Sequence, residues 1–467
     1  MQLTTELDTQ PTWLKPIRVG FGPRYLQVVR MIKDGISNGS LSPGTQIPTQ
    51  RKLAQLLDID VSTVSRAYAS AHKQGLISGT TGRGTFIAEQ ETENFGYTGS
   101  DLGLNTPPIP ESLHAALKEG LATALQTHNL PQLSTYEPFA IHAAALVQGR
   151  ARLTPFIPQA VNQPLMLATG TQSALFAILM ANCRAGDAVL CDSLTYPGFL
   201  SAARNLDLKV IPVKGDVDGM DPVALKQAIE TTKAKLLYLN PTLNNPTTRT
   251  MPLERRQAIA ACVQQFAIVL VEDDPYRQLQ PTPPPPLVTL LSSTVQSYYL
   301  ASLSKTVWPG LRTSFVLASN VEAGDVVHSA LSTLSMGLSP LLVALTVQWL
   351  ESGIASKLTD YIRQEAQNRQ ALAKTILPST AVSDPYGLHI WLQLPSYWSE
   401  DMFVHALHER GVAVAAAKSF SALDSTEGAV RISLGVCSNM GKLEQALKTV
   451  AHVYTQHPQP ALMRAVV

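Results

Sequence analysis

Residues Val295–Arg312 read VQSYYLASLSKTVWPGLR, an apolar stretch followed by a lysine and an arginine. The apolar and aromatic residues of Val295–Leu300 predict a buried β-strand. Lys305 follows this strand closely, and Arg312 stands seven positions beyond the lysine. Burial and nearby positive charge both lower the pKa of a lysine and make its amine a better nucleophile. The segment therefore predicts a reactive amine at the edge of a sheet.

The sequence around this segment indicates an α/β fold. Short apolar runs alternate with stretches of helical periodicity, which is typical of a parallel sheet covered by helices. The expected strands are Leu165–Ala168, Ala188–Cys191, Lys209–Val213, Leu236–Leu239, Ile268–Glu272 and Val295–Leu300.

Polar residues that suit one particular chemistry follow several of these strands. Pyridoxal phosphate needs a lysine, a carboxylate at its ring nitrogen, an aromatic face and a polar cradle for its phosphate. A carboxylate at the carboxyl end of a strand faces the crevice where α/β sheets bind ligands. The candidates are Lys305, Asp273 for the ring nitrogen, Tyr276 and Asn245 for the phenolic oxygen, Tyr196 for stacking, and Thr171, Gln172, Ser302 and Arg312 for the phosphate.

The first 90 residues have a different pattern. Apolar residues at helical spacing predict helices around Leu26–Ile36 and Leu53–Leu57, the second capped by Thr49, and a third from about Ser62 to His72. Two short strands, Leu76–Ser78 and Thr85–Ile87, follow. Three helices and a hairpin are the plan of a winged helix-turn-helix, whose third helix enters the major groove of DNA.

This region is also basic, which suits double-stranded DNA as a partner. Between Lys15 and Glu89 there are 10 Lys and Arg against 4 Asp and Glu, whereas the whole chain has a net charge of +1. We expect the third helix to contact bases, the preceding helix a phosphate, and the hairpin tip the minor groove. The candidate contacts are Ser62, Thr63, Arg66, Arg51 and Arg83.

Both regions resemble known families. Ile47–Ala54 (IPTQRKLA), Arg66-Ala67-Tyr68 and Gly82–Phe86 resemble the head of GntR-type regulators, and the Arg-Ala-Tyr triplet resembles their MocR branch. The segments from Gly170 to Arg312 resemble fold-type I aminotransferases. The resemblance implies that Lys305 carries pyridoxal phosphate and that Arg431 holds a substrate carboxylate.

The MocR resemblance further implies a homodimer that senses pyridoxal phosphate, with an amine or amino acid as effector, and thereby changes DNA binding. Three positions depart from the family patterns. Asp60-Val61 replaces a Ser-Arg pair at the start of the recognition helix, Thr248 replaces a glycine, and Tyr136 lacks the glycine and arginine that usually follow it. We therefore assign no role to Tyr136.

These observations predict three parts, which are residues 1–88 as the head, 89–108 as a flexible linker and 109–467 as the aminotransferase-like domain. Two alternatives stay open. In the first, the protein is an active aminotransferase for an amino acid such as 2-aminoadipate. In the second, it is a DNA-binding protein whose large domain only dimerises. The four scattered cysteines, the lack of a secretory signal and the lack of a long apolar run predict a cytoplasmic protein with no metal site and no membrane contact.

Overall fold

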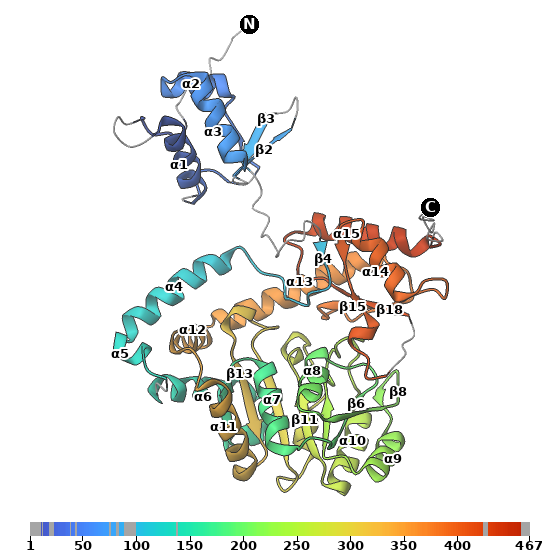
Figure 1. Cartoon of the computed structure of the whole chain (residues 1–467). Helices are drawn as coiled ribbons and strands as arrows, with labels where there is room; N and C mark the ends of the chain where they lie inside the picture. The colour runs from blue at the N-terminus through green and yellow to red at the C-terminus, as the bar shows by residue number, and fades with distance from the viewer. Residues whose placement is uncertain are drawn as a thin grey trace. The chain divides into compact units, whose positions relative to one another are not determined.

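The computed structural model divides the chain into two compact units, Met1–Gly96 and Tyr97–Val467 (Figure 1). It describes residues 11, 13–17, 23–37, 39–42, 44–73, 76–80, 84–87, 100–136, 139–423 and 428–458. Each helix in this described part of the chain is too short or too polar to span a lipid bilayer.

The first unit is a three-helix bundle with a small antiparallel sheet. Its helices are α1 (Arg24–Ser37), α2 (Gln50–Leu57) and α3 (Val61–Lys73), and its strands pair in the order β1 (Gln46–Ile47), β3 (Gly84–Ile87), β2 (Ile77–Thr80). Apolar residues of each helix pack together as the helical spacing predicted, although Leu26 of α1 is exposed. Thr49 caps α2 by accepting a hydrogen bond from the Lys52 N–H at 3.3 Å. The predicted plan of three helices and a hairpin is confirmed.

The second unit is built on a seven-stranded sheet. The strands pair in the order β5 (Leu165–Ala168), β13 (Ser314–Ala318), β12 (Ser297–Ser302), β11 (Val269–Asp273), β10 (Leu236–Leu239), β6 (Ala188–Asp192), β7 (Lys209–Val213). The six predicted strands all run in the same direction, but a seventh strand, β13, was not predicted and runs antiparallel to both β12 and β5. A short 3-10 turn, Pro309–Leu311, and the left-handed backbone of Arg312 return the chain directly beside β12, so β13 has no helical crossover before it.

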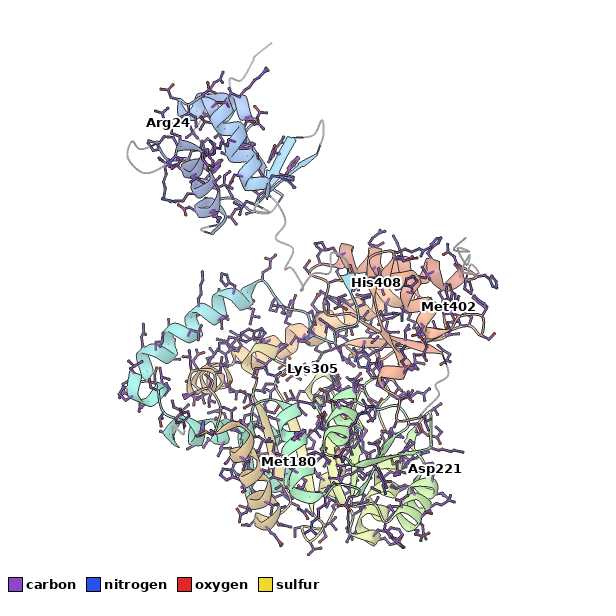
Figure 2. All side chains as sticks on the ribbon, in the orientation of Figure 1. Arg24, Met180, Asp221, Lys305, Met402 and His408 are labelled. Carbon is purple, nitrogen blue, oxygen red and sulfur yellow. The ribbon has the colours of Figure 1, made fainter. Side chains whose placement is uncertain are left out.

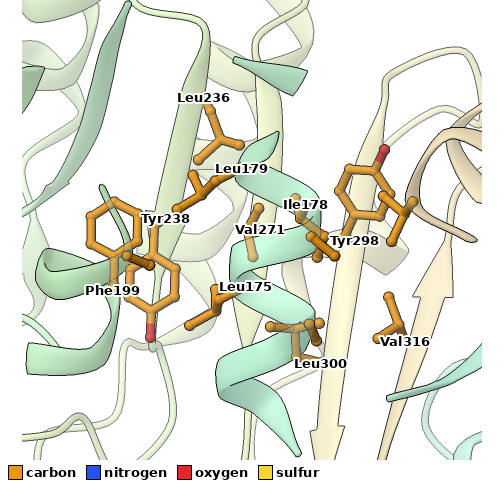
Figure 3. Packing of buried hydrophobic residues seen from close by; sticks show 14 of the residues in the cluster. Leu175, Ile178, Leu179, Phe199, Leu236, Tyr238, Val271, Tyr298, Leu300 and Val316 are labelled. Atoms are coloured by element: carbon orange, nitrogen blue, oxygen red, sulfur yellow. The ribbon is translucent and has the colours of Figure 1, made fainter. Parts of the chain in front are cut away.

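Helices cover both faces of this sheet because alternate strand residues point in opposite directions. On one face Leu236 and Tyr238 pack against α7 (Thr171–Asn182), together with Val271 and Leu300. Figure 3 shows this face, where the rings of Phe199 and Tyr238 stack with centroids 4.3 Å apart. On the other face Leu237 and Leu239 pack against α9 (Pro222–Thr232) and α10 (Leu253–Phe266).

The remaining helices complete the second unit. They are α4 (Ser112–Thr127), α5 (Leu130–Leu133), α6 (Phe139–Leu153), α8 (Pro197–Asn205), α9 (Pro222–Thr232), α10 (Leu253–Phe266), α11 (Val321–Ser335), α12 (Pro340–Glu351), α13 (Ile354–Ile376), α14 (Glu400–His408) and α15 (Met440–Thr455). Figure 1 shows α13 running from the large sheet toward the C-terminal helices.

A second, smaller sheet packs with α13, α14 and α15. It contains β14 (Ala381–Val382), β15 (His389–Gln393), β18 (Ala429–Ser433) and β17 (Ala415–Ala416). Nearby, β4 (Ser100–Asp101) pairs with β16 (Val412–Ala413). A separate hairpin joins β8 (Gly215–Asp216) to β9 (Gly219–Met220) beside α10. Leu102 is fully buried. The second unit begins at Tyr97 and so includes residues 97–108, which the sequence analysis assigned to the linker.

A fully buried ion pair joins α10 to β11. The guanidinium of Arg256 lies 3.5 Å from the carboxylate of Glu272, and both side chains are inaccessible to solvent. The arginine also donates to the carbonyls of Met251 and Pro241, at 2.9 and 3.0 Å. The carboxylate accepts from the Leu287 and Val288 N–H groups, each at 3.0 Å. The pair thus fixes the strand that ends at Asp273.

Replacing Arg256 with Met should destabilise the protein by about 3–5 kcal/mol, because it leaves the Glu272 charge buried without its partner. Urea unfolding of the second unit measures this change. As a control, Lys448→Met breaks an exposed pair with Glu444 at 2.6 Å and should cost about 0.5 kcal/mol. Equal free energies of unfolding for the two variants would contradict this account.

Candidate functional site

One cavity of about 530 Å³ lies at the carboxyl ends of the parallel strands. Figure 2 shows Lys305 between the large sheet and the C-terminal part of the second unit. Every residue that the sequence analysis assigned to a cofactor or to a substrate carboxylate lines this cavity: Lys305, Asp273, Tyr276, Asn245, Tyr196, Thr171, Gln172, Ser302, Arg312 and Arg431. Tyr136 is exposed and is not among the lining residues.

Lys305 follows the end of β12, and its amine is held inside the cavity by one main-chain contact. Its Nζ donates a hydrogen bond to the carbonyl oxygen of Asn105. Burial, together with the positive charges of Arg431 and Arg312, lowers the pKa of Lys305 to about 8, against the opposing effect of the Asp273 carboxyl. A large fraction of this amine is therefore neutral near pH 8.

Asp273 ends β11 and carries a carboxyl oxygen that points to no donor. Its Oδ2 accepts a hydrogen bond from the Tyr238 hydroxyl at 2.8 Å, whereas its buried Oδ1 has no partner in the described part of the chain. Burial and the neighbouring Asp274 raise the pKa of Asp273 to about 7, although Tyr238 and Lys305 act in the opposite direction. A buried acceptor of this kind is costly unless a donor reaches it, so the geometry provides a place for a protonated ring nitrogen.

The other end of the cavity is formed by the start of α7 and the turn after β12. Gly170 precedes α7 with φ = 82°, and a Cβ atom built there would lie 2.8 Å from Nη2 of Arg312. A glycine thus lets the guanidinium approach the helix N-terminus, whose free N–H groups attract anions. Ser302 also lines this region, with its Oγ accepting from the Ser304 N–H at 3.1 Å. Together these groups suit a phosphate dianion.

Gln172 and Asn245 bind neighbouring parts of the cavity wall. Gln172 donates through Nε2 to the Gly198 carbonyl at 2.8 Å. Asn245 accepts through Oδ1 from Nη1 of Arg431, also at 2.8 Å. Gln172 therefore positions the turn that carries Tyr196, and Asn245 positions the arginine.

Arg431 lies on β18 and projects into the cavity. Its Nη2 donates to the Gly103 carbonyl at 2.5 Å, and its guanidinium lies 4.8 Å from the centroid of the Phe420 ring. Its buried Nε has no partner among the described residues. Burial lowers the pKa of Arg431 to about 10, which still leaves it charged at neutral pH. A guanidinium has five N–H donors, of which the Asn245 and Gly103 bonds use two, so the remaining donors can hold a carboxylate.

Sequence reasoning missed the residues that hold Tyr276 in place. Asn105 donates to the Tyr276 hydroxyl at 2.8 Å, and its Nδ2 also lies 3.2 Å from Nδ1 of His389. The Nε2 atom of that histidine lies 3.1 Å from the Asn244 carbonyl. Burial and the Arg431 charge lower the pKa of His389 to about 3, so the ring is neutral. The polar composition around Asn105 indicated a linker and gave no sign of this role, whereas a histidine within the apolar strand 389–393 was a usable signal.

The candidate DNA contacts of the first unit lie on α2 and α3. Arg51, Ser62 and Arg66 are exposed and Thr63 is half-buried, while Arg83 lies outside the described residues. The guanidinium of Arg66 lies 4.2 Å from the centroid of the Tyr25 ring. Such stacking holds the side chain and leaves its N–H edge free for hydrogen bonds.

Asp60 has a local role at the start of α3. Its Oδ1 accepts from the Ser62 N–H at 2.7 Å, and this hydrogen bonding lowers the pKa of the Asp60 carboxyl. An acceptor in this position satisfies one of the free N–H groups at the start of α3. The departure from the usual Ser-Arg pair therefore affects how the recognition helix begins.

Comparisons with known proteins agree with this division. Residues 99–450 match the aminotransferase class I and II family, and residues 24–87 match the bacterial regulatory proteins of the gntR family. The HTH-type transcriptional regulator YdeF of Bacillus subtilis is 30% identical, over 93% of this chain and 95% of its own length. The 2-aminoadipate transaminase of Thermus thermophilus is 28% identical, over 64% of this chain and 80% of its own length.

A solved structure supports the fold of the second unit. The α-aminoadipate aminotransferase LysN of Thermus thermophilus, complexed with N-(5'-phosphopyridoxyl)-L-leucine, superposes with a TM-score of 0.68 at 24% identity. The match covers 76% of this chain and 92% of that one. The expected fold class, a winged helix-turn-helix head with a large fold-type I domain, is thereby confirmed.

The lowered pKa of Lys305 predicts an unusual pH profile for its amine. Acetylation of Lys305, followed by mass spectrometry, should rise with a midpoint near pH 8, because the neutral amine is the nucleophile. Arg431→Met should move this midpoint upward, since it removes a nearby positive charge. Arg410→Met, at an exposed arginine outside the cavity, should leave it unchanged. A midpoint above about pH 10 in the unmodified protein would show that the amine is not desolvated.

Proposed function

The chain belongs to the aminotransferase class I and II family, and its gntR-type head and its similarity to HTH-type transcriptional regulators place it in the MocR branch of regulators. From this we propose that the protein binds pyridoxal phosphate in the cavity around Lys305 and regulates transcription in response to it. The observation that carries the proposal is the meeting of Lys305, Asp273 and Arg312 in one cavity. These residues supply an amine for the aldehyde of this cofactor, a carboxyl for its ring nitrogen and a cation for its phosphate.

The residues present fit pyridoxal phosphate. Oδ1 of Asp273 lacks a donor within the described chain, and a protonated ring nitrogen supplies one. Arg312, which Gly170 allows to approach the start of α7, would hold the phosphate there. Tyr196 lines the same cavity as the aromatic face, and the Tyr276 hydroxyl is positioned by Asn105 for the phenolic oxygen. When bound, the cofactor supplies an aldehyde that captures amines and a ring that accepts electrons.

Proton positions in the cavity follow from burial. Lys305 is poised to lose its proton near pH 8, and the Asn105 carbonyl holds its Nζ in place. Burial raises the pKa of Asp273 to about 7, and a cation next to its Oδ1 would lower this pKa and favour the ionised carboxylate. The lowered pKa of Lys305 favours capture of an aldehyde at neutral to mildly alkaline pH, where Asp273 is also largely ionised and can pair with a cation.

Arg431 suggests the chemical class of the effector. Its guanidinium is held by Asn245 and by the Gly103 carbonyl, and its Nε remains available. An amine that also carries a carboxylate can reach the lysine end with its nitrogen and the arginine with its carboxylate. We therefore assign an amino acid as the effector that acts together with the cofactor.

The head turns this binding into a regulatory output. A ligand shifts DNA affinity only if it binds two arrangements of the protein with different free energies. We propose a cytoplasmic homodimer whose two heads contact two half-sites of double-stranded DNA, as symmetric helix-turn-helix proteins do. Arg51, Ser62, Thr63 and Arg66 supply the contacts within the described residues, and Arg83 supplies a further one.

A second candidate function is transamination. It is favoured by one observation, that the complete set of cofactor and carboxylate residues lines the cavity and no position of the set is lost. Two results together would support the enzyme and contradict the regulator. The protein would convert an amino acid and a keto acid with sustained turnover, and its Kd for DNA would be the same with and without the cofactor.

Pyridoxal phosphate, with or without an amino acid, should change the apparent Kd for DNA by roughly fivefold or more, which is the usual range of coupling between sites. Mobility shifts on DNA sites that the wild-type protein selects from a random pool measure this change. Lys305→Ala should keep DNA binding and lose the response. Identical Kd values with and without the cofactor, across the amino acids tried, would refute the regulatory role.

Arg66→Ala should weaken binding to the selected sites by roughly tenfold or more, because a guanidinium that reads a base edge is lost. The same measurement on Lys33→Ala, an exposed lysine on α1, controls for the loss of one positive charge from the head. The absorbance of bound pyridoxal phosphate should be unchanged in both variants. Equal losses in the two variants would remove Arg66 from the specific contacts.

A further inference from the structure

A second cavity, of about 350 Å³, lies where the end of α6, the segment after Tyr276 and the start of α13 meet. Three arginines line it, together with one acidic residue and two hydroxyl groups. These residues are Arg152, Arg277, Arg363, Asp360, Ser356 and Thr359. The lining is therefore strongly basic.

Two of the arginines are already bonded within the protein. Arg363 lies 2.8 Å from the Asp360 carboxylate and donates to the Leu279 carbonyl at 3.0 Å. Arg277 lies 3.5 Å from the Asp274 carboxylate and donates to the Pro284 carbonyl at 2.8 Å. Their charges are thus compensated.

Arg152 is different. Its guanidinium makes two long hydrogen bonds, to the hydroxyl oxygens of Thr306 at 3.3 Å and Thr359 at 3.5 Å. The ion pairs of the described residues include none for this arginine. Burial lowers the pKa of Arg152 to about 10. Arg152 is half-buried, and a partly desolvated cation with no counter-ion favours the binding of an anion in this cavity.

We propose that this cavity binds a small molecule through one oxyanion group, a carboxylate or a phosphate, which pairs with Arg152. The Ser356 hydroxyl, which also lines the cavity, can donate to the same group. Asp360 neutralises Arg363, which limits the site to one anionic group. The volume accommodates a molecule of metabolite size.

The site is next to the segment that carries Lys305. Thr306 follows that lysine directly, and its carbonyl accepts a hydrogen bond from the Thr359 hydroxyl at 2.8 Å. An anion that draws the Arg152 guanidinium toward itself competes with the Arg152–Thr306 bond. If the proposed function holds, an anion in this cavity therefore changes the position of Lys305 through Thr306. Binding of the anion itself does not depend on that function.

Calorimetric titration with inorganic phosphate tests the proposal. The cradle at Arg312 would also take phosphate, so the titration is performed on the full-length Arg312→Gln protein. We expect this protein to bind phosphate. Adding Arg152→Gln should weaken the Kd roughly tenfold or more, the usual effect of losing a charged hydrogen-bonding partner.

Lys357→Gln is the matched control. It removes one positive charge from the start of α13, beside Ser356, at an exposed residue that does not line the cavity. Adding it to the Arg312→Gln protein should change the Kd little. Equal weakening by the two added substitutions would mean that the anion responds to net charge, and would overturn the proposal, as would the absence of phosphate binding in the Arg312→Gln protein.

Crystals of the unsubstituted protein soaked in selenate provide a test that needs no variant. Anomalous scattering should place a selenium atom against the Arg152 guanidinium, separate from any peak at Arg312. A carboxylate from a second copy of the chain in this cavity, with no selenium there, would overturn the proposal. A peak at Arg152 in a protein that fails to bind pyridoxal phosphate would uphold this site and refute the proposed function alone.

Discussion

The structure depends on an amine and a carboxyl that are buried in one cavity without being bonded to each other. Removal from water shifts both pKa values toward neutrality, to about 8 for Lys305 and about 7 for Asp273. Neither group has a charged partner within the described residues: the lysine donates to a main-chain carbonyl, and Oδ1 of the carboxyl accepts no hydrogen bond. A ligand with an aldehyde at one end and a cationic ring nitrogen at the other can bind both groups.

The surrounding fold maintains this arrangement at some cost. The Arg256–Glu272 pair fixes the strand just before Asp273, and neutral His389, through Asn105, fixes the Tyr276 hydroxyl. The positive φ of Gly170 brings the helix N-terminus against a guanidinium. Such pre-organisation means that binding does not have to order the site first, which preserves affinity for a small ligand.

The sequence predicted the cavity residues well because the carboxyl ends of parallel strands converge, so residues far apart in the chain could be placed together from strand positions alone. It failed where function depends on tertiary contacts. Asn105 lies in a polar stretch that has the composition of a linker, and the antiparallel course of β13 depends on the turn at Arg312. The stacking of Arg66 on Tyr25 joins α3 to α1 and leaves no periodic signal.

The central claim is that the amine of residue 305 captures pyridoxal phosphate in this cavity. Borohydride reduction of the protein mixed with the cofactor, followed by peptide mass spectrometry, tests it most directly. The account predicts a pyridoxyl group fixed to the peptide that contains Lys305, at about one group per chain, and a sharp loss of this product in Asp273→Asn. Labelling spread over surface lysines, with none at Lys305, would contradict it.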